Sequence, residues 1–177
     1  QKTAALTTAT NNTLTQGAVN VDGGAATTSV TVVQDAAVAA LNTIAPGNTA
    51  NKIGVVAGNV SIDDKNAGIA TAATIATVSV TNAGTVAVDS AALATLKLAG
   101  TMGDVNTTLT GGVAQNTALA LNTTGATTGA ITLDAGTKTV NVTNSGTSTV
   151  ANLTAAGATA LTVAGSGDLS FATSALL

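Results

Sequence analysis

Any core that this chain builds has to be made almost without aromatic side chains. Phe171 is the only aromatic residue among 177, while Ala (38 residues) and Thr (36) dominate the composition. A Phe, Tyr or Trp buries roughly 150–250 Å², whereas a fully buried Val or Leu contributes only about 1.5–3 kcal/mol. Stability must therefore come from many small, regular contacts and from backbone hydrogen bonds. This constraint favours a repetitive structure over an irregular globule.

The same restricted alphabet excludes most catalytic and binding chemistry. His, Cys, Arg and Glu are absent, and the charged residues are eight Asp and five Lys, giving a net charge of −3. Catalytic triads and zinc, haem and iron–sulfur sites need His or Cys. Nucleic-acid binding needs a cationic face, usually with Arg and stacking aromatics. We expect neither an enzyme nor a nucleic-acid partner.

Disorder and membrane insertion are disfavoured by the hydropathy pattern. Disordered chains combine low hydrophobicity with high net charge, but the mean hydropathy here is +0.46. Thr, Asn or Gly interrupts each apolar run well before the ~20 residues that a membrane-spanning helix needs. The chain starts at Gln1 without the basic and apolar regions of a signal peptide. We interpret it as a processed product or as a piece of a longer protein.

Short stretches in which Val, Ile or Leu alternates with Thr, Ser, Asn or Ala recur from residue 17 onward. A period of two is typical of a half-buried β-strand. Each stretch ends at Gly, Asn, Asp or a similar turn residue. The predicted strands are 18–22, 29–33, 59–63, 75–81, 85–89, 93–98, 118–122, 130–134, 138–143, 160–163 and 168–171.

The spacing of these strands, about eight to twelve residues, is compatible with a sandwich, a barrel or a β-solenoid. Small residues suit tight turns and a narrow interior, and Asn and Thr can form ladders between stacked turns. We therefore predict an all-β fold, a parallel β-helix or β-solenoid, with a Greek-key β-sandwich as the alternative. Residues 1–16 are predicted to be an irregular N-terminal segment. Residues 17–177 form the strand-repeat domain, with 34–56 as a long loop or insertion.

Two long segments carry a resemblance to a known class of protein. Residues 17–33 read GAVNVDGGAATTSVTVV, and residues 76–101 read ATVSVTNAGTVAVDSAALATLKLAGT. Residues 129–134 (GAITLD) and 138–146 (KTVNVTNSG) follow the same style. Over residues 17–177 the chain resembles the β-strand regions of bacterial surface-layer (S-layer) proteins and related RTX-type surface proteins exported by type I secretion.

This resemblance implies a segment of a β-helical protein that tiles the cell surface in a lattice, often with Ca²⁺ ordering its domains. One departure matters. The tandem nonapeptide G-G-x-G-x-D-x-U-x, whose loops bind Ca²⁺ in RTX proteins, is absent, and residues 165–169 (GSGDL) are only a shortened echo of it. The metal sites of the family therefore cannot be transferred to this chain.

Ca²⁺ is the one metal that the residues themselves suggest, because it takes carboxylate, amide and carbonyl oxygens. The densest cluster is Asp63, Asp64 and Asn66 in one turn, although these residues also suit a simple polar turn. Acids that follow strands could align and share a cation if the turns of a solenoid stack, or they could simply cap turn amides. These further candidates are Asp22, Asp89 and Asp134, together with Asp104 and Asp168 beside glycines.

These observations favour a structural protein of the bacterial cell surface, extracellular, that associates with itself into an S-layer lattice or matrix. An alternative is the subunit of an extracellular filament or pilus, in which residues 1–16 add as a strand to a neighbour. A further alternative is the stalk or binding module of a large adhesin, with cell-surface polysaccharide as a partner. Rows of Thr-x-Thr, typical of ice-binding solenoids, do not recur at one fixed spacing here, so ordinary strand Thr is the better interpretation.

Overall fold

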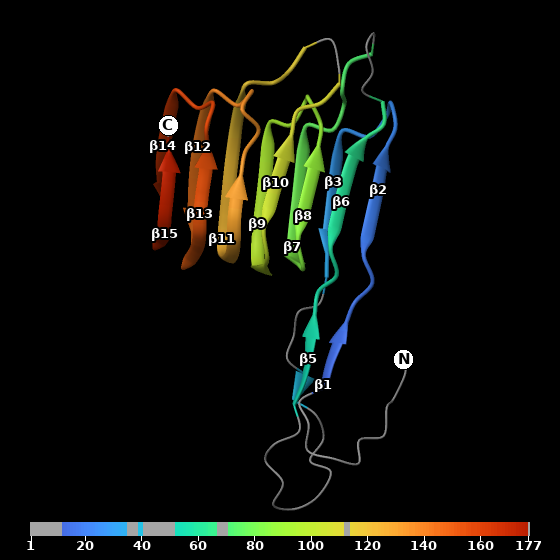
Figure 1. Ribbon diagram of the computed structural model, residues 1–177, viewed down its shortest axis with the longest axis vertical. Coiled ribbons are helices and arrows are strands. Elements are labelled where there is room, and N and C mark those ends of the chain that lie inside the picture. Colours follow the sequence, from blue (N-terminus) through green and yellow to red (C-terminus); the bar gives the residue numbers. More distant parts are fainter. Residues whose placement is uncertain (1–11, 35–38, 41–51, 67–70, 112–113, 177) are drawn as a thin grey trace, which may run out of the picture.

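The computed structural model is a parallel β-solenoid. It describes residues 12–34, 39–40, 52–66, 71–111 and 114–176, and the described part contains strands and turns but no helix. Figure 1 shows the turns side by side, with the axis of the coil running across the view. The predicted all-β solenoid is confirmed. The Greek-key sandwich is wrong, because the strands of the coil pair in parallel.

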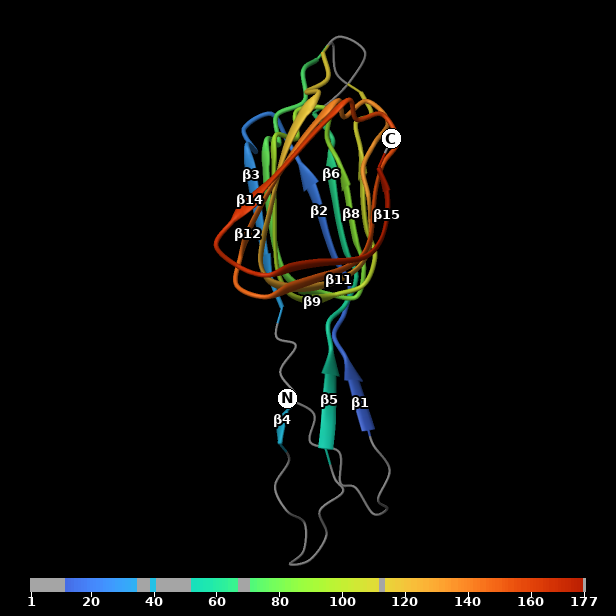
Figure 2. The same cartoon turned by 90° about the vertical axis from the view of Figure 1, so that its left-hand side faces the viewer.

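The coil has two faces, and each turn contributes one strand to each (Figure 2). The first face, in spatial order, consists of β2 (Val19–Gly23), β6 (Val60–Asp64), β8 (Val86–Asp89), β10 (Val105–Thr108), the second half of β11 (Ala118–Thr132), β13 (Ser148–Ala155) and β15 (Leu169–Leu176). The second face consists of β3 (Ser29–Val33), β7 (Thr77–Ala83), β9 (Thr95–Met102), the first half of β11, β12 (Thr139–Ser145) and β14 (Ala160–Gly165).

The core is made of columns of small apolar side chains that point inward from successive turns. Because side chains alternate along a strand, the same inward position recurs at every level of the stack. On the second face, one column runs through Val30, Val78, Leu96, Leu121, Val142 and Val163. On the first face, Val19, Val60, Val86, Val105, Ile131 and Leu153 form its counterpart. These columns form a core that has no aromatic residues at its centre.

Glycines line the lower corner of Figure 1, where the second face passes into the first through very short connections. Gly84 donates its N–H to the carbonyl of Gly58 (2.8 Å), Gly103 to Gly84 (2.7 Å) and Gly129 to Gly103 (3.1 Å). A Cβ added at Gly103 would lie 2.2 Å from the Gly84 carbonyl oxygen. The close stacking of turns at this corner therefore requires the absence of a side chain.

A small sheet leaves the coil below its N-terminal end. It contains β1 (Asn12–Thr15), β5 (Lys52–Val56) and β4 (Ala39–Ala40), with β1 parallel and β4 antiparallel to β5. The segment 34–56, expected as a loop or insertion, lies between β3 and β6 and includes β4 and β5. The segment 1–16, expected to be irregular, includes β1, and its first eleven residues lie outside the described part.

Gly103→Ala tests the close approach at the lower corner. We expect it to lower the free energy of unfolding by about 1–3 kcal/mol, the usual cost of inserting extra atoms into a packed site. Gly24→Ala is the matched control, because a Cβ there would meet nothing within 4 Å. Urea unfolding followed by far-ultraviolet circular dichroism measures both. Equal stabilities of the two variants would contradict the account of this corner.

Candidate functional site

Three aspartates lie side by side on the outer surface of the first face. Asp22 of β2 pairs in register with Asp63 of β6, and Asp63 pairs with Asp89 of β8. Adjacent strands are ~4.8 Å apart, so three carboxyl-bearing residues follow one another at that interval. We call Asp22, Asp63 and Asp89 the aspartate row. Two of the strand-ending acids named from the sequence, Asp22 and Asp89, lie in this row on either side of Asp63.

Lys65 places a positive charge beside this row. It lies in the short chain reversal directly after β6 and forms an ion pair with the carboxylate of Asp63. The hydrogen bond and charge of Asp63, and then the charges of Asp22 and Asp89, raise the pKa of Lys65. Both members of the pair are substantially exposed, so water screens the attraction and its contribution to stability is small.

An open hollow of about 330 Å³ lies beside the row. It is lined by Asp63, Asp64, Lys65, Asp89, Thr110 and Gly111. The Asp89 carboxylate accepts hydrogen bonds from the backbone N–H of Thr110 (3.0 Å) and from the Thr110 hydroxyl. The loop that follows β10 is therefore tied to the row, so that one carboxylate of the hollow is already engaged.

Asp64, the next residue along β6, is a buried structural acid rather than an open ligand. Its exposed fraction is 3%. One carboxylate oxygen accepts from the N–H groups of Thr74 (2.6 Å) and Ile75 (2.8 Å) and from the Ser90 hydroxyl (3.0 Å). The other accepts from the N–H of Asn66 at 3.2 Å. Asp64 thus holds together the loop after β6, the approach to β7 and the turn after β8.

These hydrogen bonds determine the protonation of Asp64. Burial alone would raise its pKa, because it disfavours the charged form. The N–H groups of Ile75 and Thr74, the Ser90 hydroxyl and the N–H of Asn66 outweigh burial, and the pKa of Asp64 is lowered from its ordinary value. The side chain is therefore a carboxylate at neutral pH.

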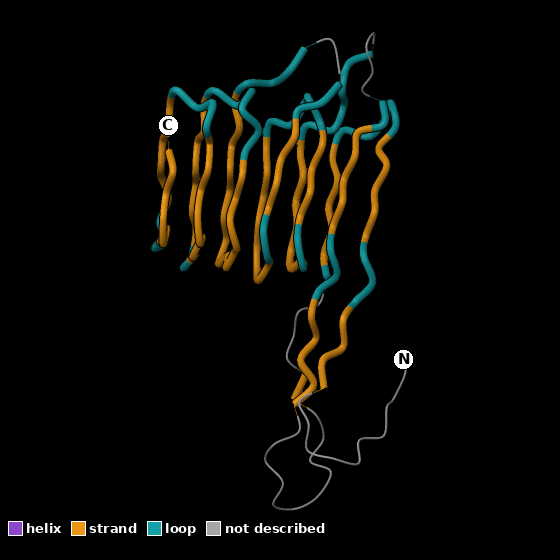
Figure 3. The backbone as a smooth tube through the Cα atoms, in the orientation of Figure 1, coloured by secondary structure: helices purple, strands orange, loops and turns teal. Residues whose placement is uncertain are grey.

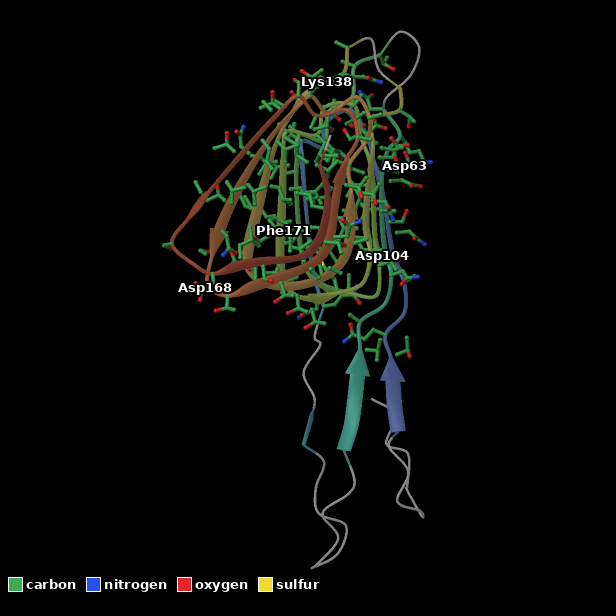
Figure 4. The ribbon with its side chains drawn as sticks, turned by 60° about the vertical axis from the view of Figure 1, so that its left-hand side comes forward. Asp63, Asp104, Lys138, Asp168 and Phe171 are labelled. Atoms are coloured by element: carbon green, nitrogen blue, oxygen red, sulfur yellow. The ribbon has the colours of Figure 1, made fainter. Side chains whose placement is uncertain are left out.

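The other candidate residues do not join the aspartate row. Asn66 uses its side-chain amide to donate to the Ala72 carbonyl (2.8 Å). Asp134 accepts from Gly136 N–H (2.7 Å) in its own loop and from Leu109 N–H (3.3 Å) in the loop that follows β10. Asp104 lies at the lower corner and accepts from Ala130 N–H (2.9 Å). Asp168 lies well away from Asp63, just before β15 (Figure 4).

The arrangement does not form a ready cation site. In the part of the chain that the structure describes, no three acidic side chains converge in a way that could hold a metal ion. Ca²⁺ takes six to eight oxygen ligands, whereas Asp63 faces the Lys65 ammonium and Asp64 and Asp89 accept hydrogen bonds. The residues as arranged do not fit Ca²⁺, and its involvement stays a prediction from the sequence and the resemblance.

Sequence reasoning missed two asparagines, Asn144 and Asn82, whose side chains tie the ends of second-face strands to neighbouring turns. Asn144 is almost fully buried, accepts from the Thr123 hydroxyl (2.8 Å), and donates to the carbonyls of Gly146 (2.9 Å) and Asp168 (3.0 Å). Asn82 adopts a positive φ of 57° and links the Gln34 carbonyl to the N–H of Thr101. The sequence did contain a signal for both residues. Each Asn lies two residues before a glycine, at the end of a stretch in which apolar and polar residues alternate.

Comparisons with known proteins leave the chain without an assigned relative. No protein-family model, curated protein or solved structure matches it. The resemblance to S-layer and RTX-type proteins accordingly stays a prediction. Across the described residues we find no helix with the length and apolar character needed to cross a membrane.

Replacing Asp64 tests its structural role. Asp64→Ala removes the acceptor for the N–H groups of Thr74 and Ile75 and for the Ser90 hydroxyl. Because each buried group left unpaired costs about 1–3 kcal/mol, we expect a loss of at least about 2 kcal/mol in the free energy of unfolding. Asp63→Ala is the neighbouring control and should cost less than about 1 kcal/mol, as is usual for an exposed ion pair. Equal losses in urea unfolding would refute this division of roles.

The lowered pKa of Asp64 also predicts how stability depends on pH. The ordinary pKa of Asp, about 3.9, applies to the unfolded chain, and the folded value lies below it. The stabilisation is therefore complete above the unfolded pKa and is lost as the pH falls through the folded pKa. Melting temperatures of the wild type and of Asp64→Asn, measured from pH 7 to pH 2, should converge in acid. A gap that does not change with pH would rule out this origin.

Proposed function

We propose that this chain is a structural protein of the bacterial cell surface whose function is to associate with copies of itself into an S-layer lattice or extracellular matrix. The observation that carries the proposal is the composition of the outer surface of the second face. Its outward positions are occupied by Thr, Ser, Asn and Ala in register from turn to turn, for example Ser29, Thr77, Thr95, Ala120, Asn141 and Thr162.

The near absence of charge makes this surface suitable for lateral packing. Among the described strand residues of the second face, Lys97 is the one that carries a charge. A surface close to neutral lets identical copies approach without mutual repulsion. Hydroxyl and amide groups in register offer hydrogen bonds to a facing copy, and the regular stack of strands makes that surface long.

The two faces of the coil differ in charge, which supports the second face as the lateral contact. The first face carries the aspartate row, balanced only in part by Lys65. Like charges on facing copies would meet there. The proposal therefore places lateral contacts on the second face and leaves the first face toward solvent.

Electron microscopy of the purified chain tests self-association directly. We expect extended sheets or bundles at high protein concentration, because neutral faces pack without repulsion. Images taken in EDTA and in Ca²⁺ examine the expected role of the ion in ordering the array. Monodisperse single particles in both solutions at high concentration would count decisively against the proposal.

A charge placed on the second face should interfere with packing. Thr143→Lys puts a cation at an exposed outward position of β12, and we expect it to raise the concentration needed for assembly severalfold. Thr132→Lys, at an exposed outward position of the first face, is the matched control and should leave that concentration unchanged. Light scattering over a concentration series measures both. Identical effects would show that net charge alone, rather than this face, controls assembly.

A further inference from the structure

One residue in each turn of the main stack takes the chain from the second face into the lower corner. Residues with positive φ lie at this place in four successive turns: Asn82 (57°), Gly100 (72°), Gly125 (53°) and Gly146 (76°). This left-handed conformation is easy for Gly and tolerated by Asn. Gln34 follows β3 at the place that Asn82 has in β7, because Val33 pairs with Thr81, but the φ of Gln34 is not positive. The chain therefore leaves the coil at Gln34 instead of turning the corner.

The chain returns to the same corner just before β6. We call residues 35–56 the excursion; its described part contains β4 and β5, which lie below the coil (Figure 3). Ala57 and Gly58 occupy the places that Ala83 and Gly84 have in the next turn, because β6 and β8 pair in register. Both alanines are 5% exposed. The corner is thus complete on its first-face side, although 22 residues separate it from β3 and Gln34.

The side-chain amide of Gln34 joins the two open ends of this corner. Its Nε2 donates to the Gly58 carbonyl (2.9 Å), and its Oε1 accepts from the Gly58 N–H (2.8 Å). Two residues paired in an antiparallel ladder exchange hydrogen bonds in the same way. The backbone of Gln34 is also held, because its N–H donates to the Thr81 carbonyl (2.9 Å) and its carbonyl accepts from the Asn82 side chain (2.8 Å). Gln34 is 6% exposed, and each of its four polar atoms has a partner.

We propose that Gln34 closes the coil in place of a covalent corner, so that the excursion is an inserted module that the coil carries but does not need in order to fold. This inference does not rest on the self-association proposed above. The Gly58 carbonyl also accepts from the N–H of Gly84 (2.8 Å). The ladder of corner glycines therefore continues through a turn in which the chain itself is interrupted.

The two ends of the excursion lie close enough for a direct link. Gln34 and Gly58 occupy the places of Asn82 and Gly84, between which the chain has a single residue. Removing the excursion leaves Ala57 alone between Gln34 and Gly58. The residue at position 34 must then take the left-handed conformation of Asn82, which Asn adopts more readily than Gln. The better residue at this position is therefore Gln with the excursion and Asn without it.

Four chains test this dependence: the natural chain, Gln34→Asn, a deletion of residues 35–56, and the same deletion carrying Gln34→Asn. In the full chain, Gln34→Asn should lower the equilibrium constant for folding about tenfold, because the shorter side chain leaves the Gly58 N–H unpaired. In the deletion, the same substitution should raise the midpoint of urea unfolding. The deletion with Asn should unfold at no lower urea concentration than the natural chain, because a shorter loop costs less closure entropy. Far-ultraviolet circular dichroism follows the unfolding.

Gln115→Asn is the matched control, because the Gln115 side chain donates to the Leu109 carbonyl (2.6 Å) in the loop that follows β10. It should lower the midpoint equally with and without the excursion, as expected for independent sites. A deletion that does not fold, with either residue at position 34, would overturn the claim that the coil only carries the excursion. A change for Gln34→Asn that is absent, or the same in both chains, would overturn the closure by Gln34.

Gln34→Glu tests the paired hydrogen bonds in the full chain. A carboxylate cannot donate to the Gly58 carbonyl, whereas a protonated acid can donate and accept as the amide does. The partners of Gln34, which are Gly58, Thr81 and Asn82, do not titrate. Burial favours the protonated acid, so its pKa in the folded chain should lie above the ordinary value of about 4.3. The deficit against the natural chain should therefore be largest near pH 7 and shrink toward pH 4.

Gln34→Met is the control for this measurement, because it fills similar space but forms neither hydrogen bond. At pH 4 the Glu variant should unfold at a higher urea concentration than the Met variant. Equal midpoints of these two variants at pH 4 would overturn the paired hydrogen bonds as the closure of the corner.

Discussion

The parallel, in-register pairing of each turn with the next is the constraint on which the rest of the structure depends. It gives every inward position the same neighbours one turn above and one turn below, so Val, Ile and Leu suffice where an irregular core would need aromatic rings. It also requires the chain to turn tightly at one corner. The glycines there, each hydrogen-bonded to the previous turn, allow the backbones to approach to within a distance that a Cβ would prevent.

The alternation of apolar and polar residues predicted most strands of the coil, because this fold uses one simple period throughout. It failed where the period is weak or shifted. β10 was missed because Val105 is its only large apolar residue. β13 was missed because its inward positions shift between Val150 and Leu153. Residues 118–122 and 130–134 were predicted as two strands, but β11 runs continuously through the corner between them.

The candidate site was predictable only in part, for a related reason. Strand-ending acids align when turns stack, and Asp22 and Asp89 do so. Whether a carboxylate stays open, however, depends on loops whose course the period does not determine. Asp64 is one residue beyond Asp63 and therefore points to the opposite side of the strand, where backbone N–H groups engage it. Asp134 is drawn to its own loop in the same way.

The two faces of the coil give this molecule two different surfaces. The first face concentrates the aspartate row and Lys65, whereas the described strands of the second face carry a single charge, on Lys97.

The unequal corners of the coil have a consequence for how such a sequence can change over generations. Connections at the lower corner within the main stack are at most three residues long, whereas those at the upper corner include residues 65–76 and 109–117. Eighteen residues separate Val78 from Leu96, but 25 separate Leu96 from Leu121, without loss of column alignment. Six of the seven extra residues lie in the upper passage, because 16 residues separate Val105 from Leu121 whereas 10 separate Val86 from Leu96. Most of this length variation is thus absorbed along one edge of the rod. That edge is where new peptide could be accommodated and displayed while the rest of the coil keeps its repeat.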